Sequence, residues 1–168
     1  MKNIVIIGAG GVGREVSLII EKINNKFKFA TIIDPRVWIH DYITIGEGTI
    51  IYEGVILTAN IEVGNHVIVS PKCGIGHDSI IKDYVSLLWN VNVSGNDVIE
   101  EGVMMGSGST VIQGKRIEKG STVGAGAVVI DDIDSYSTVV GVPAKVIKVD
   151  YGRRERENEE SLICNNCK

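Results

Sequence analysis

The sequence predicts a mainly all-β protein built as a β-solenoid, and two regularities predict it. Sixteen consecutive positions spaced six residues apart, from Ile39 to Val129, hold an aliphatic residue or Met. Three residues after most of them stands Gly, Asn or Asp. A period of six fits neither the 3.6-residue period of a helix nor the two-residue period of an ordinary strand. It is typical of a solenoid in which short strands alternate with sharp corners.

Ahead of the repeat, the sequence predicts a short βα unit over residues 1–38. Residues 2–7 are an apolar run typical of a strand, and residues 13–24 place aliphatic residues on one face of a helix. The loop between them has the GxGxxG pattern of phosphate-binding loops. Its candidate ligand contacts are Gly8, Gly10 and Gly11. Because one strand and one helix are too few for a dinucleotide-binding sheet, the loop either holds part of a nucleotide or packs against the coils.

The β-helix itself is predicted over residues 39–149. The sixteen aliphatic or Met positions are called the ladder positions below. Two residues before most of them the side chain is small or β-branched, so both sets fit a narrow interior. The Gly, Asn and Asp residues are expected at the corners, because they tolerate left-handed backbone angles. Residues 141–145 predict a turn and residues 146–149 a last strand that covers the open end. Residues 150–168 are a charged tail.

Composition excludes several functions. The net charge is −4, and no basic face is visible, so no nucleic-acid partner is expected. No segment approaches the roughly 18 apolar residues of a membrane span. Three cysteines make no disulfide framework, which indicates a cytoplasmic protein. Cys164 and Cys167 form a single CxxC, half a zinc site at best, so no metal is expected.

The chain resembles the hexapeptide-repeat acyltransferases, and within them the sialic acid and bacillosamine-type sugar O- or N-acetyltransferases. The resemblance is carried by residues 3–11, 29–35, 73–81 and 141–145. It implies a left-handed parallel β-helix with three hexapeptides per coil, and the handedness rests on the resemblance alone. It also implies that the N-terminal nucleotide domain of this branch is shortened here to one βα unit.

His77 is the candidate catalytic base, because the resemblance gives the histidine of the His-Asp segment that role. Asp78 either orients the imidazole or is a corner residue chosen for its backbone. One coil further on stands Gly95, which we expect about 4.8 Å above His77. A glycine there leaves its amide accessible as an oxyanion donor, and the resemblance gives its counterpart a contact with the acetyl carbonyl.

The resemblance implies acetyl-CoA as the acyl donor, bound along the coils at a boundary between the subunits of a homotrimer. Small residues would line it and lysines would contact its phosphates. The expected lining residues are Gly95, Gly106, Gly108, Gly124, Ala125 and Gly126, and the expected lysines are Lys115, Lys145 and Lys148. The implied acceptor is a sugar, with N-acetylation of a nucleotide-linked amino sugar expected. Trp89 either stacks on this ligand or covers a coil edge.

Three other functions remain as alternatives. A non-catalytic scaffold would use the coils for assembly, and the shortened N-terminal unit would then mark a lost activity. An O-acetyltransferase would act on a different small acceptor. A zinc carbonic anhydrase of the same fold needs three converging histidines that include a closely spaced pair, whereas His40, His66 and His77 lie far apart in the sequence.

Overall fold

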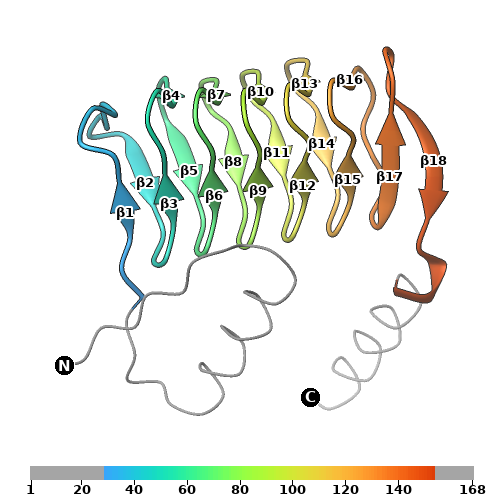
Figure 1. Ribbon diagram of the computed structural model, residues 1–168, viewed down its shortest axis with the longest axis horizontal. Helices are drawn as coiled ribbons and strands as arrows, with labels where there is room; N and C mark the ends of the chain where they lie inside the picture. The colour runs from blue at the N-terminus through green and yellow to red at the C-terminus, as the bar shows by residue number, and fades with distance from the viewer. Residues whose placement is uncertain (1–28, 154–168) are drawn as a thin grey trace, which may run out of the picture.

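The computed structural model describes residues 29–153, which form one parallel β-helix (Figure 1). Three sheets run along its axis, and each coil adds one short strand to each sheet. The first sheet consists of β1 (Ile32–Ile33), β3 (Ile50–Ile51), β6 (Ile68–Val69), β9 (Ser86–Leu87), β12 (Met104–Met105), β15 (Thr122–Val123), β17 (Ser137–Val140) and β18 (Lys145–Val149). The second consists of β4 (Ile56–Leu57), β7 (Gly74–Ile75), β10 (Asn92–Val93), β13 (Thr110–Val111) and β16 (Val128–Val129). The third consists of β2 (Ile43–Ile45), β5 (Ile61–Val63), β8 (Ile80–Ile81), β11 (Val98–Ile99) and β14 (Arg116–Ile117).

Neighbouring parallel strands pair residues that lie three hexapeptides apart over most of the helix. In the first sheet Ile51 pairs with Val69, Val69 with Leu87, and Leu87 with Met105. The six-residue period is therefore confirmed, and so is the coil of three hexapeptides that the resemblance implies. The pairing begins with β1, which lies inside the range assigned to the N-terminal unit.

The aliphatic ladders are the core. Ladder residues such as Ile75, Leu87 and Ile99 are almost completely buried, and only the first two ladder positions, Ile39 and Ile45, are partly buried. Each buried side chain of this size contributes roughly 1.5–3 kcal/mol relative to exposure. Because every coil stacks only on its neighbours, the core is long and narrow, and its residues are ordered by register along the axis.

The corners adopt the left-handed angles that the sequence predicts. Positive φ occurs at the expected Gly, Asn and Asp positions, among them Asp78 with φ 60°. It also occurs at three corners that hold larger residues, His66, Lys72 and Tyr84. Asp132 was expected at such a corner, but after β16 the positive φ falls at Tyr136 instead.

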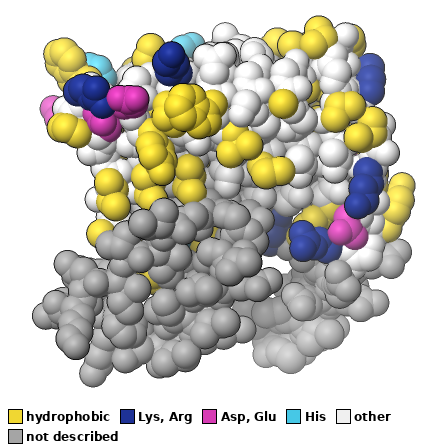
Figure 2. Space-filling model, viewed as in Figure 1, with side chains coloured by type: hydrophobic (Ala, Val, Ile, Leu, Met, Phe, Trp, Pro, Cys, Tyr) yellow, Lys and Arg dark blue, Asp and Glu magenta, His cyan; other side chains and the backbone are white. Residues whose placement is uncertain are grey.

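The last coil ends as the sequence predicts. Residues 141–144 form a turn, and β18 returns antiparallel to β17. Residues 151–153 add one helical turn. Apolar side chains are exposed on the face in Figure 2. Exposed apolar side chains of the first sheet include Ile32 and Met104, and Tyr52, which directly follows β3, is exposed as well. Within residues 29–153, no helix is long and apolar enough to cross a bilayer, and no three His, Cys, Asp or Glu side chains are grouped to hold a metal.

Candidate active site

The corners of successive coils stack into edges, and one of them carries His77. This histidine edge consists of residues 58–60, 76–78, 94–96 and 112–114, between the second and third sheets. Each corner donates an amide to a carbonyl of the previous corner. The bonds run from Asp78 to Ala59 (3.0 Å), from Asn96 to His77 (2.6 Å) and from Gly114 to Gly95 (3.0 Å). The edge is thus a continuous ladder with the imidazole at its middle.

The imidazole of His77 is held by the residue that follows it. Nδ1 of His77 and Oδ2 of Asp78 are 2.7 Å apart, and both side chains are about half exposed. Asn60, one coil earlier, donates from Nδ2 to Oδ1 of Asp78 at 2.7 Å. When Nδ1 donates to the carboxylate, Nε2 carries the free lone pair that a base requires. Asn60 was not predicted from the sequence, although its place one full coil before Asp78 could have indicated it.

The charge on Asp78 is stabilised by the same contacts. The hydrogen bond from Asn60 lowers the pKa of Asp78 below its usual value, and the contact with His77 lowers it further. The side chain is therefore a carboxylate throughout the neutral range. A fixed negative charge beside Nδ1 favours the imidazolium that forms when Nε2 accepts a proton.

Gly95 lies directly against the imidazole, one coil above it. A Cβ atom at this position would come within 2.5 Å of Nε2 of His77. The Gly95 amide donates no hydrogen bond to any residue in the range 29–153, but Gly95 is buried beneath the ring. The expected amide donor therefore makes no hydrogen bond within the described residues, and the imidazole lies against its residue.

Gly76 explains how the two corners approach so closely. A Cβ at Gly76 would lie 2.5 Å from the carbonyl carbon of Ser94 and 2.6 Å from the amide nitrogen of Gly95. Contacts this short are prohibitive for any side chain, because both atoms belong to the backbone. The glycine thus allows the His77 and Gly95 corners to stack tightly.

The predicted coenzyme A lining lies on a different edge. This glycine edge consists of residues 88–90, 106–108 and 124–126, between the first and second sheets. It holds Gly106, Gly108, Gly124, Ala125 and Gly126, and also Trp89, whose carbonyl accepts the Gly108 amide at 2.8 Å. Trp89 is 57% exposed. Within one chain the second sheet separates this edge from His77.

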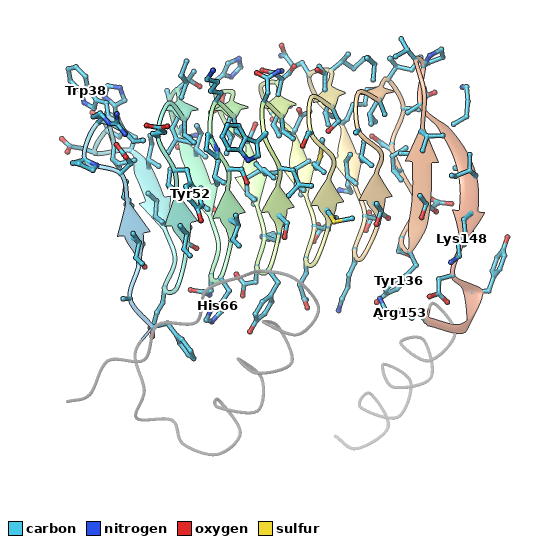
Figure 3. All side chains as sticks on the ribbon, in the orientation of Figure 1. Trp38, Tyr52, His66, Tyr136, Lys148 and Arg153 are labelled. Atoms are coloured by element: carbon cyan, nitrogen blue, oxygen red, sulfur yellow. The ribbon has the colours of Figure 1, made fainter. Side chains whose placement is uncertain are left out.

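The lysines expected at the phosphates are dispersed. Lys115 follows the histidine edge and is partly buried. Lys145 is exposed at the start of β18, where it pairs with Val140. Lys148 lines a cavity of about 130 Å³ together with Tyr136 and Arg153 at the C-terminal end of the first sheet (Figure 3).

The glycine loop lies outside the described residues, so Gly8, Gly10 and Gly11 have no structural counterpart here, and the same holds for Cys164 and Cys167. Asp34 stands about 20 residues after the glycine loop, where dinucleotide-binding proteins place a ribose-binding acid. Its Oδ1 and Oδ2 each accept a hydrogen bond from Arg36 at 2.9 Å. These bonds lower the pKa of Asp34 to about 2.

Comparison with solved structures finds the same coil in known enzymes. A histidine variant of perosamine N-acetyltransferase from Caulobacter crescentus, in complex with CoA and GDP-perosamine, aligns with a TM-score of 0.79. It is 25% identical, and the alignment covers 84% of this chain and 67% of that one. The acetyltransferase domain of PglB from Neisseria gonorrhoeae aligns with a TM-score of 0.76 at 28% identity, over 81% of this chain and 65% of that one.

Curated relatives match shorter stretches, and no family model matches the chain. Serine acetyltransferase of Salmonella typhimurium is 30% identical over 96 residues, 51% of this chain and 35% of that protein. The acyl-carrier-protein-dependent UDP-N-acetylglucosamine O-acyltransferase of Ectopseudomonas mendocina is 30% identical over 123 residues, 72% of this chain and 48% of that protein. The chain thus spans half or less of the length of these relatives.

Coils of three hexapeptides, corners at positive φ and aliphatic ladders define a β-helix of hexapeptide repeats, and the solved neighbours confirm the predicted left-handed fold. In fold and in sequence the chain is thus similar to acyltransferases built from hexapeptide repeats.

Proposed function

We propose that the chain is an acetyl-CoA-dependent acetyltransferase that N-acetylates an amino sugar, with His77 as the general base. The observation that carries this proposal is the Asn60–Asp78–His77 chain of hydrogen bonds, which fixes the imidazole with Nε2 against the Gly95 corner. A base oriented by a carboxylate is the arrangement that proton removal requires, and such catalysis typically contributes about 10²–10⁴-fold.

The reaction is a direct transfer. Nε2 of His77 accepts a proton as the acceptor nitrogen attacks the thioester carbonyl, so that a C–N bond forms and the C–S bond breaks. The proton on the imidazole then passes to the leaving thiolate of coenzyme A. The Gly95 amide is suited to stabilise the carbonyl oxygen during attack, since no residue in the described part of the chain uses it.

Acetyl-CoA is the proposed donor, and a homotrimer is the proposed assembly. The neighbour from Caulobacter crescentus was solved with CoA, and a second structure of the PglB domain contains acetyl-CoA. The small residues of the glycine edge leave room beside the backbone, since a Cβ at Gly108 or Gly126 would meet no atom within 4 Å. Because the glycine edge and His77 lie on different edges, the site would form where the histidine edge of one subunit meets the glycine edge of another.

The acceptor class follows from the same neighbours. Perosamine N-acetyltransferase was solved with GDP-perosamine, so we propose a nucleotide-linked amino sugar for this chain. O-acylation is the second candidate, because the 123-residue match is to an O-acyltransferase.

The test is coenzyme A release from acetyl-CoA, measured with a panel of free and nucleotide-linked amino sugars and matched hydroxyl sugars. Wild-type protein should release coenzyme A with an amino sugar. His77→Gln should not, whereas His66→Asn, on another edge, should. Activity on hydroxyl sugars alone would replace N-acetylation by O-acetylation, and an inactive wild-type trimer would favour the scaffold alternative.

A further inference from the structure

Asp97 is a carboxyl group buried inside the coil. Its side chain is fully shielded from solvent, and it occupies the inner position that Ile43, Ile61 and Ser79 hold in earlier coils. Oδ1 accepts a hydrogen bond from the Lys115 amide at 2.7 Å. Oδ2 has no hydrogen-bond partner among the described residues. A buried oxygen without a partner is costly and calls for an explanation.

Three buried hydroxyl groups at inner positions show what such a residue can do in this fold, whereas the buried hydroxyls of Ser109 and Ser137 have no hydrogen-bond partner among the described residues. Each of the three accepts a hydrogen bond from an amide about one coil later and donates its own hydrogen to a carbonyl of the intervening corner. The residues and their two partners are Thr49 with Val67 and Gly64, Ser79 with Asp97 and Ser94, and Ser121 with Ser137 and Asp134. These bridges fasten the corner of one coil to the coil below it.

Asp97 already makes the first of these two bonds. In Thr49 and Ser79 the carbonyl that accepts the hydroxyl lies 15 residues further on, and the equivalent carbonyl for Asp97 is that of Ile112. A carboxylate has no hydrogen to donate, whereas a protonated carboxyl has one. Oδ2 therefore lacks a partner as a carboxylate, and as the neutral acid it would have a hydrogen to donate to the Ile112 carbonyl.

The corner concerned borders the candidate active site. Residues 112–114 form the next corner of the histidine edge, and the Gly114 amide donates to the Gly95 carbonyl at 3.0 Å. Gln113 lies one coil after Gly95, as Gly95 does after His77. The position of this corner thus decides how much room remains above Gly95.

We propose that Asp97 is a positioning residue, which as the neutral acid bridges the Lys115 amide and the Ile112 carbonyl and so holds the 112–114 corner on Gly95. As a carboxylate it loses the bond to Ile112 and releases the corner. The proposal rests on the proposed function in one respect, that acetyl-CoA approaches Gly95 past this corner.

The surroundings of Asp97 allow it to titrate in the relevant range. Burial raises the pKa of Asp97 to about 6, against the opposing effect of the backbone amides of Lys115, Gly114 and Ser94 and of the Lys115 ammonium. Lys115 is the charged group that faces it from the next coil, and the hydroxyl of Ser79 faces it from the previous one. The other inward side chains of its coil are aliphatic or Met, namely Val91, Val93, Ile99, Val103 and Met105.

Asp97→Asn is the decisive variant, because its amide can donate to Ile112 and accept from Lys115 at every pH. The first measurement is hydrogen exchange of the segment 112–115 in the intact protein between pH 5 and 8. We expect wild type and Asp97→Asn to exchange alike near pH 5 and wild type to exchange at least about fivefold faster near pH 8, as for the loss of one hydrogen bond. A ratio that does not change with pH would overturn the proposal. Asp97→Ser, which copies the hydroxyl of Ser79, is the second variant if the first fails to fold.

The second measurement is the KM for acetyl-CoA over the same range. The KM of wild type should rise with pH relative to that of Asp97→Asn. The kcat values of the two proteins should change with pH in the same way, because His77 is common to both. A pH-dependent exchange ratio with identical KM profiles would overturn the positioning role. If no protein transfers acetyl groups, the proposed function fails, and the exchange measurement alone decides whether Asp97 holds the corner.

Discussion

Gly95 and His77 are in contact across one coil of the helix. The imidazole lies against the glycine so closely that a Cβ at position 95 would be 2.5 Å from Nε2, 2.7 Å from Cε1 and 2.9 Å from Cδ2. The ring thus fills the space that a side chain would take. Asp78 holds the ring through its contact with Nδ1, and the lack of a side chain at Gly95 leaves the space that the ring occupies.

Gly95→Ala should therefore disable the base without unfolding the coil. The added methyl group would push the half-exposed ring away and break its bond to Asp78, and misplacement of a catalytic group by about 1 Å can cost about 10²-fold in rate. We expect kcat to fall by about this factor, with the circular dichroism spectrum and melting temperature nearly unchanged. Gly74→Ala is the matched control, since the nearest atom to its Cβ is Oδ1 of Asn92 at 3.5 Å. Equal losses in both variants would contradict the contact.

Asp78→Asn should reduce kcat/KM by about tenfold, because it keeps the corner backbone and removes the charge that supports the imidazolium. The pKa of Asp78 is lowered, so the carboxylate is already fully formed at pH 5. The ratio of wild type to variant should therefore stay constant from pH 5 to 9 and decline only at lower pH, where Asp78 becomes protonated.

Asn60→Ala removes the hydrogen bond that Asp78 receives at 2.7 Å. We expect a smaller loss of kcat/KM, about threefold to tenfold, the equivalent of one ordinary hydrogen bond. Asn92→Ala, an exposed side chain on β10, serves as the control. An unchanged Asn60→Ala enzyme would show that Asp78 needs no support from the previous coil.

The separation of the two edges predicts complementation between inactive subunits. His77→Gln removes the base, and Ala125→Trp fills the exposed corner of the glycine edge, so each trimer should be inactive alone. If each site joins the histidine edge of one subunit to the glycine edge of the next, randomly mixed trimers should recover about a quarter of wild-type activity. Light scattering should give three times the chain mass of 18.1 kDa. Inactive mixed trimers would place both edges of a site on one chain, whereas an active Ala125→Trp trimer would exclude the glycine edge from the site.

Asp97 should make stability depend on pH in a defined direction. Its pKa is about 6 in the folded chain and 3.8 ordinarily, so the unfolded chain loses this proton first as pH rises. The buried carboxyl therefore lowers the free energy of unfolding as pH rises. This loss is absent below about pH 4, grows between about pH 4 and 6, and reaches its full value of about 3 kcal/mol above about pH 6. The melting temperature of Asp97→Asn should therefore exceed that of wild type increasingly over this range, at fixed protein concentration. Asp41→Asn, on the surface, should show no such difference.

The sequence was sufficient for most of the fold because the coil repeats one local rule. Burying a ladder residue such as Leu87 requires the same spacing and a corner at the same place in every hexapeptide. Each further hexapeptide with this pattern therefore adds support for the same fold. His77, Asp78 and Gly95 could be placed on one edge for the same reason, since residues separated by one full coil in the sequence are in contact in space.

Features that depend on particular side chains were not predictable in this way. His66 and Tyr84 occupy corners at positive φ where the period favours glycine, and their rings stack with centroids 5.0 Å apart. Tertiary contact thus overrides the corner preference. Trp89, which is expected either to stack on a ligand or to cover a coil edge, lies exposed on the edge of Gly108, and its role stays a prediction. Asp97 was missed because an acid after Asn96 looks like part of an exposed corner, although the ladder through Ser79 and Lys115 places it inside.

Because residues one coil apart stack on one another, the place of a residue within its coil decides on which sheet or edge its side chain lies. Loss of one residue between Asn60 and His77 would turn the imidazole off its edge and bury polar side chains in its place. Gain or loss of a whole coil elsewhere would keep every edge in line and change only the length of the rod. Lineages that carry this site are therefore free to vary in multiples of a full turn, and they are constrained against every smaller change.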